Sequence, residues 1–243
     1  MNVLIACEES QTICKAFRER GHNAFSCDIQ PCSGGHPSWH FQDDALSVIK
    51  NVGGNLETGE VLFVKKWDLL IAHPPCTYLT VTGLRWFYHP EDAHLPVEQR
   101  REHPNHIGRR LRREKAIAFF LEFTKTNVER WAIENPVGCM STIYKKPTQI
   151  IHPYMFGEKA SKKTCLWLHN LPPLKPTKIV DKGEQVTYKS GCIMPKWYVE
   201  VANLPPAERR KARSKTFQGI ADAIAEQWSN PKYPKQIELF FEE

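Results

Sequence analysis

The sequence predicts an α/β fold built on a largely parallel sheet. Short apolar runs at residues 2–7, 23–28 and 67–72 each have the length and composition of a buried strand. A helical pattern separates the first two runs, so that strand, helix and strand follow one another within the first 28 residues. With 243 residues, 41% of them hydrophobic, the chain can build one sizeable core.

The first half of the chain predicts these elements in order. After the strand at 2–7, residues 11–21 predict a helix with Ile13, Ala16 and Phe17 on one face and Gly21 at its end. The next strand closes at Asp28. The following segments are a loop at 30–42, a strand end and short helix at 43–52, the strand at 67–72, and a long loop at 77–106.

The second half continues with a helix at about 107–126 and strands at 130–136 and 164–168. Residues 170–212 are rich in proline and lysine, with one possible strand at 197–201, and Ser214 is expected to N-cap a helix that extends to Trp228. The expected organisation is a catalytic and cofactor-binding domain at 1–168, a small recognition-like insertion at 169–212, a returning helix at 213–230, and a loosely attached tail at 231–243.

Composition indicates the class of protein, its cellular compartment and the charge of its partner. No apolar run approaches the roughly 20 residues that span a bilayer, and the N-terminus predicts a strand, not a signal peptide. Eight cysteines are scattered without a CxxC pair, which is typical of a reduced, cytoplasmic protein. The net charge of +6 favours a polyanionic partner weakly. Seven basic residues against three Glu between 98 and 115 indicate either a solvated helix face or a phosphate-contacting surface.

Chemically active side chains follow the ends of the predicted strands, where ligands bind in open α/β sheets. Pro74-Pro75 ends one strand and holds Cys76 in place, because two φ angles are fixed and two N–H donors are removed. A thiolate there could add to an electron-poor carbon, while Glu134 on a neighbouring strand could protonate a ring nitrogen. The alternative is a buried strand-end cysteine and a carboxylate that anchors a loop.

These segments resemble a known family. "HPPCTYLT" and "AIENP" resemble the Pro-Cys and Glu-Asn signatures of the cytosine-C5 DNA methyltransferases, in the same chain order. Together with "CEES", "ENPVGCMST" and "KKTCLWLHNLPPLKPT", they are similar to compact phage and prophage members, over roughly residues 1–228. The resemblance implies a Rossmann-like class I S-adenosylmethionine-dependent methyltransferase sheet with helices on both faces. It also implies DNA as partner, a monomer or weak dimer, and the cytoplasm of a bacterial host.

The family's chemistry assigns roles by position. Cys76 would attack C6 of a flipped-out cytosine and Glu134 would hold or protonate N3, so that C5 accepts a methyl group from S-adenosyl-L-methionine. Asp28 would bind the cofactor ribose and Asp44 its adenine amino group. The implied cofactor-binding residues are Cys7, Glu8, Glu9, Asp28, Ile29, Asp44, His73 and Pro74. The implied substrate-binding residues are Pro75, Asn135, Lys162, Thr164, Arg109, Arg110, Arg112 and Arg113.

The chain also departs from the family pattern. "CEESQT" holds no glycine where the family's cofactor loop is glycine-rich, so the tight turn must be built differently. Thr77 follows the catalytic cysteine in place of glutamine, and Lys162 and Thr164 stand for two arginines, although lysine cannot form a bidentate fork. Only about 45 residues separate Trp167 from Arg213, which predicts loose sequence specificity or a non-duplex substrate.

Further interpretations stay open. The substrate could be RNA or a free cytosine nucleotide, or the protein could be a catalytically silent nucleic-acid-binding relative. Cys27, Cys32, His36 and His40 have a spacing that resembles a zinc site, although Cys27 precedes the proposed ribose-binding residue on a strand. His73 is interpreted as a packing or hydrogen-bonding residue more readily than as a base.

Overall fold

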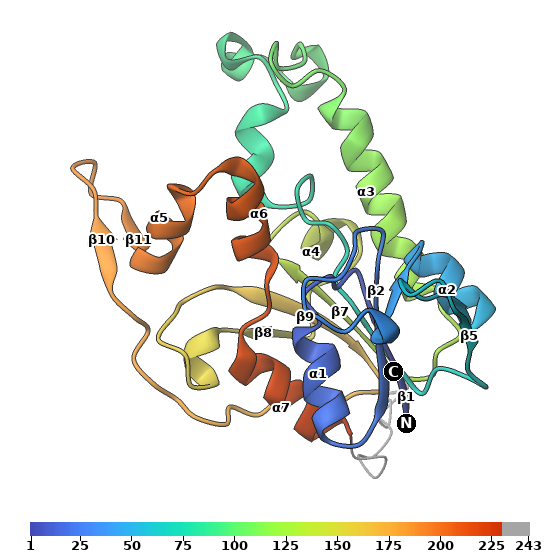
Figure 1. Cartoon of the computed structure of the whole chain (residues 1–243). Helices are drawn as coiled ribbons and strands as arrows, with labels where there is room; N and C mark the ends of the chain where they lie inside the picture. The colour runs from blue at the N-terminus through green and yellow to red at the C-terminus, as the bar shows by residue number, and fades with distance from the viewer. Residues whose placement is uncertain (230–243) are drawn as a thin grey trace, which may run out of the picture.

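A seven-stranded sheet forms the centre of the computed structural model, which describes residues 1–229 (Figure 1). The strand order is β3-β2-β1-β6-β7-β9-β8. The first five strands in this order are mutually parallel, and β9 runs antiparallel to both of its neighbours. The strands are β1 (Asn2–Ala6), β2 (Asn23–Asp28), β3 (His40–Gln42), β6 (Leu69–Ala72), β7 (Trp131–Pro136), β8 (Gln149–Ile151) and β9 (Thr164–His169).

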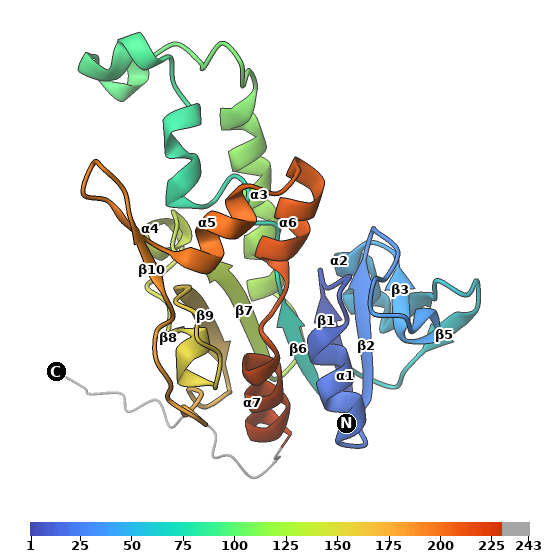
Figure 2. The ribbon, with the colours of Figure 1, turned by 60° about the vertical axis from the view of Figure 1, so that its left-hand side comes forward.

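Both faces of the sheet are covered by helices, which explains why its central strands are continuous apolar runs. Alternate residues of β1 enter opposite cores: Val3 faces α1 (Thr12–Glu19) and α7 (Gln218–Trp228), while Leu4 faces α2 (Ala45–Asn51) and α3 (Arg109–Thr124). Figure 2 shows α1 and α7 side by side. The prediction of an α/β fold with a largely parallel sheet is confirmed.

The structure corrects three local predictions. Residues 197–201 do not form a strand but lie in helix α5 (Lys196–Ala202). Ser214 ends α6 (Pro206–Ser214) and does not cap the final helix, which begins at Gln218 after Phe217. The segment predicted as a loop at 30–42 contains β3. Elements that were not predicted are β4 (Gly53–Asn55), β5 (Val61–Phe63), α4 (Met140–Ile143), β8, β10 (Gln185–Thr187), β11 (Ile193–Pro195) and α6.

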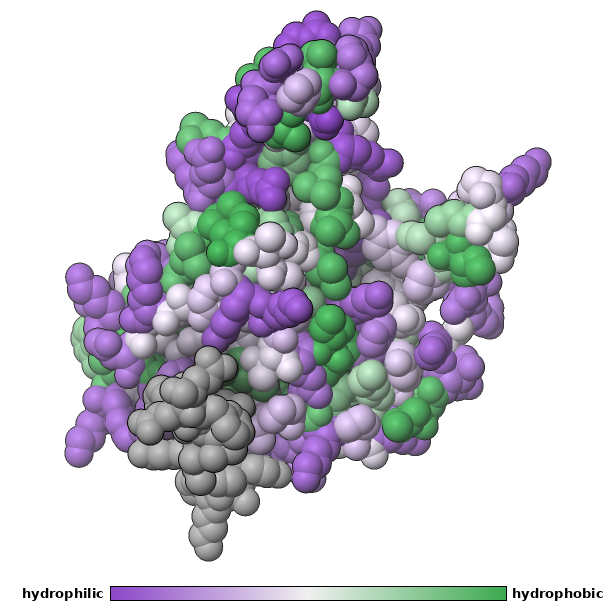
Figure 3. Space-filling model, turned by 180° about the vertical axis from the view of Figure 1, so that it is seen from behind, coloured by the Kyte–Doolittle hydropathy of each residue, from purple (hydrophilic) through white to green (hydrophobic). Residues whose placement is uncertain are grey.

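The predicted long loop forms an arm, which we define as residues 77–108 together with the first half of α3. It contains three short 3-10 helices, η2 (Val81–Trp86), η3 (Pro90–His94) and η4 (Val97–Gln99), and extends away from the sheet (Figures 1 and 2). Hydrophobic side chains are visible among hydrophilic ones along the back of the molecule (Figure 3). On the arm, the side chains of Leu84, Val97, Ile107 and Leu111 are exposed, and Leu111 lies in the first turn of α3.

The predicted insertion at 169–212 is not a separate unit throughout. Leu171 and Leu174 are buried in the same core as α1 and α7, whereas β10, β11 and α5 lie outside the sheet. Helix α6 lies above the carboxyl ends of β6 and β7 (Figure 2). The predicted tail at 231–243 lies outside the described residues. None of the helices described within residues 1–229 has the length and hydrophobicity needed to cross a bilayer.

Candidate functional site

Strands β6 and β7 end side by side, and the segment after β6 is held to β7. The amide of Asn135 donates a hydrogen bond of 2.7 Å from Nδ2 to the carbonyl oxygen of Pro74, and both residues are buried. Pro75 is exposed next to this contact. Because the two prolines fix φ and Asn135 fixes the carbonyl, the chain delivers Cys76 at a defined position beyond the strand end.

The carboxylate of Glu134 pairs with the imidazole of His73. Nδ1 of His73 lies 3.2 Å from Oε2 of Glu134, and both side chains are largely buried. Burial by itself would raise the pKa of Glu134, but the hydrogen bond and charge of His73, with Lys162, outweigh it and hold this pKa below its ordinary value. The other ring nitrogen of His73, Nε2, is buried without a hydrogen-bond partner among the described residues.

The thiol of Cys76 shares this environment. Burial raises the pKa of Cys76, the charge of Glu134 raises it further, and the charge of Lys162 lowers it. Both charged groups therefore act on the sulfur, Glu134 from strand β7 and Lys162 from the segment that precedes β9. The thiol is half-buried, which leaves it accessible to a reactant.

A narrow pocket joins the predicted residues to the segment between α6 and α7. Its polar lining includes His73, Glu134, Lys162 and Thr164, and its volume of about 20 Å³ is room for roughly one water molecule. Ser214, Thr216 and Phe217 close it from the other side. These three residues form one wall of the pocket. Lys162 is hydrogen-bonded to the chain next to this wall, because its Nζ donates to the carbonyl oxygen of Arg213 at 3.0 Å. A pyrimidine ring can reach Glu134 from this side only if the wall moves.

The glycine-free turn after β1 is built on two left-handed residues. Cys7 has a φ of 60° and Gln11 a φ of 57°, a region that costs most non-glycine residues roughly 1–2 kcal/mol. The fully buried side chain of Gln11 offsets this cost by donating to Ser26 Oγ and the His36 carbonyl and by accepting from the His36 N–H. Gln11 was not among the predicted site residues. No sequence signal marks it, because its partners are brought by β2 and the loop after it.

Glu8 and Glu9 separate into different roles. The buried carboxylate of Glu8 accepts hydrogen bonds from the N–H groups of Ile13, at 2.7 Å, and Cys14, at 3.2 Å, and so satisfies the start of α1. Burial raises the pKa of Glu8 to about 7, against the charge of His73 and these two N–H groups. Glu8 thus holds the helix, and only Glu9 faces a pocket.

The residues assigned to the ribose and adenine lie at the same edge of the sheet. Besides burial, the charges of Asp28 and Asp44 raise the pKa of the Cys7 thiol, so the three groups are close together. Asp28 accepts from the N–H of Gln30 at 3.0 Å, and burial raises its pKa. Asp44 accepts from the Ser47 N–H at 2.8 Å as the N-cap of α2. Ile29, beside Asp28, is 75% exposed.

The four arginines do not form one surface. Arg109 is buried; its guanidinium donates to the carbonyl oxygen of Thr77 at 3.1 Å and lies over the rings of Tyr78 and Phe87. The interpretation of Arg109 as a phosphate contact is therefore wrong, because its charge is enclosed by the arm. Arg113 is half-buried over Phe87.

Arg110 and Arg112 remain exposed on α3, and Nε of Arg110 lies 3.7 Å from Oε1 of Glu102.

The spacing of Cys27, Cys32, His36 and His40 that resembles a zinc site does not correspond to a metal site in the structure. Both ring nitrogens of His40 are within hydrogen-bond distance of Ser26 and Gln30, and Cys27 donates to the carbonyl of Asp43. Across residues 1–229, no three His, Cys, Asp or Glu side chains come together as a metal site.

Comparisons with family models and with curated proteins do not assign the chain to a family. No protein-family model matches the chain, and no curated protein matches it.

Proposed function

We propose that the protein transfers a methyl group from S-adenosyl-L-methionine to C5 of cytosine in DNA. One observation carries the proposal: Cys76 and Glu134 lie at the carboxyl ends of the neighbouring parallel strands β6 and β7. The His73–Glu134 and Asn135–Pro74 hydrogen bonds hold these two ends together. The resemblance of their two segments to the Pro-Cys and Glu-Asn signatures supports the same chemistry.

Cys76 would act as the nucleophile. Its thiolate forms a bond to C6 of the ring while N3 takes up a proton, which makes C5 electron-rich. S-adenosyl-L-methionine, when bound, supplies an electrophilic methyl group to C5. Loss of the C5 proton and of the N3 proton then returns the electron pair to the ring, breaks the bond between sulfur and C6, and releases Cys76. The balance needs no oxidant or reductant.

Glu134 and His73 would manage the proton at N3. The low pKa of Glu134 means that its carboxylate is ionised at neutral pH and can accept a hydrogen bond from the cytosine amino group. A proton for N3 must then come through its partner, and the imidazole at 3.2 Å is placed to give one. The sequence context predicts a packing or hydrogen-bonding role for His73, and the proposal adds the delivery of a proton to that role.

The residues beyond β1 and β2 are suited to the cofactor's polar groups. Asp28 offers carboxylate oxygens to ribose hydroxyls at the end of a parallel strand, the usual location for nucleotide ligands in such sheets. Asp44 has a second carboxylate oxygen beyond the one that caps α2, and it is exposed. The first five strands also follow the Rossmann-like order, which supports a class I methyltransferase sheet.

DNA as substrate is supported by exposed basic side chains near the site. Helix α6 carries the exposed Arg210 and Lys211 and the half-buried Arg209 above the carboxyl ends of β6 and β7, and α3 carries the exposed Arg110 and Arg112. All eight cysteines are free thiols, which fits a reducing cytoplasm. Because β10, β11 and α5 make a small recognition segment, RNA or a free cytosine nucleotide is the second candidate substrate.

Two assays test the proposal. Incubation with tritiated S-adenosyl-L-methionine and duplex DNA of defined sequence should place label on cytosine C5. DNA containing 5-fluorocytosine should become covalently attached to Cys76, because fluorine at C5 cannot leave as a proton does. If label appears on RNA or on a free cytosine nucleotide but not on DNA, the second candidate substrate is the correct one. If the protein binds the cofactor but methylates none of these substrates, it is a catalytically silent relative.

A further inference from the structure

A second pocket, separate from the one at Glu134, opens between the β1–α1 loop and α6. Its volume is about 250 Å³. Apart from Gly34, every residue in its lining has a polar or charged side chain. The lining residues are Glu9, Ser10, Thr12, Lys15, Ser33, Gly34, Lys211, Lys215 and Gln218.

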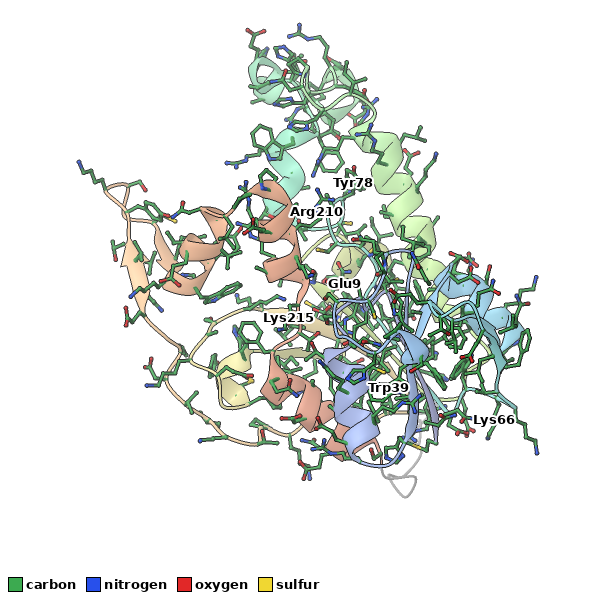
Figure 4. The ribbon with its side chains drawn as sticks, viewed as in Figure 1. Glu9, Trp39, Lys66, Tyr78, Arg210 and Lys215 are labelled. Carbon is green, nitrogen blue, oxygen red and sulfur yellow. The ribbon has the colours of Figure 1, made fainter. Side chains whose placement is uncertain are left out.

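Three lysines of this pocket come from two distant parts of the chain. Lys15 extends from α1 and reaches the carbonyl of Gly34 at 3.4 Å, while Lys211 and Lys215 come from α6 and the residue after it. None of the three forms an ion pair with a carboxylate within residues 1–229. Against one carboxylate, that of Glu9, the lining has a net charge of +2. Figure 4 shows Lys215 next to Glu9.

The ligand group that suits this lining is a phosphate. Lysine ammonium groups bind phosphate as point charges, and the hydroxyls of Ser10, Thr12 and Ser33 add donors around them. The start of α1 does not contribute, because Glu8 already occupies the N–H groups of Ile13 and Cys14. An uncharged or apolar group would leave three ammonium charges without a counterpart.

The segment 211–218 relates this pocket to the candidate site. Lys211, Lys215 and Gln218 face the lysine-lined pocket, while Ser214, Thr216 and Phe217 face the pocket at His73 and Glu134. One wall thus separates the two pockets. A nucleotide whose base enters on one side would therefore bring its phosphate near the other.

We infer that the lysine-lined pocket binds a phosphate of the nucleotide that carries the reacting base, or of its neighbour in a strand. The inference rests on the proposed function for the identity of the base, but phosphate binding itself needs neither cofactor nor turnover. The source is the backbone of a DNA strand or the 5′-phosphate of a free nucleotide.

Calorimetry without cofactor tests the inference on the full chain. The probes are deoxycytidine, deoxycytidine 5′-monophosphate and a single-stranded 12-mer DNA at several salt concentrations. The variants are the double substitution Lys211→Gln with Lys215→Gln, the single substitution Lys15→Gln, and Lys66→Gln as a matched control. Lys66 lies at the far side of the molecule from Lys215 (Figure 4).

The wild type and Lys66→Gln should bind a phosphate-bearing probe, and the double variant should lose most of that binding. If the 12-mer is the ligand, its salt slope should fall by about 1.4, or roughly 0.7 for each lysine removed. If the monophosphate is the ligand, its affinity should fall in the double variant toward that of deoxycytidine. The single substitution Lys15→Gln should lower the affinity for the same probe by a smaller factor than the double substitution.

Equal binding of all phosphate probes by the double variant and the wild type would overturn the inference. So would a loss of S-adenosyl-L-methionine affinity in the double variant without any change for the phosphate probes, because the pocket would then hold the cofactor's carboxylate. Lysine-dependent phosphate binding without any methyl transfer would support the inference while the proposed function fails.

Discussion

Nδ1 of His73 lies 3.2 Å from Oε2 of Glu134, where β6 and β7 end side by side. The pair couples the segment that carries Cys76 to the neighbouring strand. It also sets the charge of the site, since the imidazole and the charge of Lys162 together outweigh the effect of burial on the pKa of Glu134.

Substitution of His73 should move the pH dependence of methyl transfer. In His73→Gln the hydrogen bond and charge that lower the Glu134 pKa are weakened, so burial raises this pKa. The limb of the pH–rate profile that reports ionised Glu134 should shift to higher pH when the profile is measured at saturating cofactor. A profile with its acidic limb in the same place would show that His73 does not act on Glu134.

Substitution of Glu134 should affect both the rate of methyl transfer and the reactivity of the Cys76 thiol. Glu134→Gln should slow methyl transfer by about 10²- to 10⁴-fold, the usual contribution of acid–base assistance. It should also move the alkylation of Cys76 by iodoacetamide to lower pH, because the carboxylate raises the thiol pKa. Peptide mass spectrometry separates Cys76 from the exposed Cys192, whose alkylation should not change, and Glu129→Gln is the matched control.

Substitution of Cys76 should abolish methyl transfer and the covalent adduct with 5-fluorocytosine DNA. A serine hydroxyl is a much poorer nucleophile than a thiolate at neutral pH, so the loss should reach several orders of magnitude. Cofactor affinity and the melting temperature should remain near those of the wild type. Cys139→Ser, at another half-buried cysteine, is the control. Residual turnover in Cys76→Ser at a tenth of the normal rate would exclude covalent catalysis by this residue.

Glu8 should make the folded state less stable as pH rises through the weakly acidic range. Its pKa is raised from 4.5 to about 7 in the folded protein, so the native state keeps a proton that the unfolded chain has lost. Stability from this group is therefore complete below pH 4.5 and declines until pH 7. Glu8→Gln keeps an acceptor for α1 and should flatten that decline in urea unfolding curves. An identical decline in both proteins would contradict the raised pKa.

The arginines of the arm should divide into two classes. Arg112→Gln and Arg110→Gln should each weaken DNA binding and reduce its salt slope by about 0.9. Arg109→Gln should instead destabilise the protein by about 1–3 kcal/mol, because the carbonyl of Thr77 loses its partner. Thermal unfolding and salt titrations measure the two effects. A full salt effect at Arg109 would mean that its side chain is free to leave the arm.

The sheet could be predicted from sequence because its central strands are continuous apolar runs ended by distinctive residues. The helix at α1 was equally clear, since Ile13 and Phe17 repeat at helical spacing. By contrast, β8 and α6 carry no internal pattern: β8 is defined by pairing with β9, and α6 has no buried residue. Short elements whose stability comes from distant partners leave no local signal.

The site shows the same division. The positions of Cys76 and Glu134 at the ends of neighbouring strands could be predicted, because strand ends are marked in the sequence and converge in parallel sheets, whereas their catalytic roles stay predictions. The roles of Arg109 and Glu8 could not, since both depend on which backbone groups the fold leaves without partners nearby. The lysine-lined pocket was also beyond sequence reasoning, because Lys15 and Lys215 are brought together only by the return of the chain to α1.

The turn after β1 has a consequence for finding related proteins. Its backbone path is maintained by a cysteine and a buried glutamine, each in a conformation usually reserved for glycine. Patterns that require a glycine-rich loop will therefore miss chains that use the same solution. A more useful sequence pattern would combine the glutamate that caps the first helix, here Glu8, with a glutamine three residues later, here Gln11, and a serine on the second strand, here Ser26. These side chains hold the loop where other proteins use glycine.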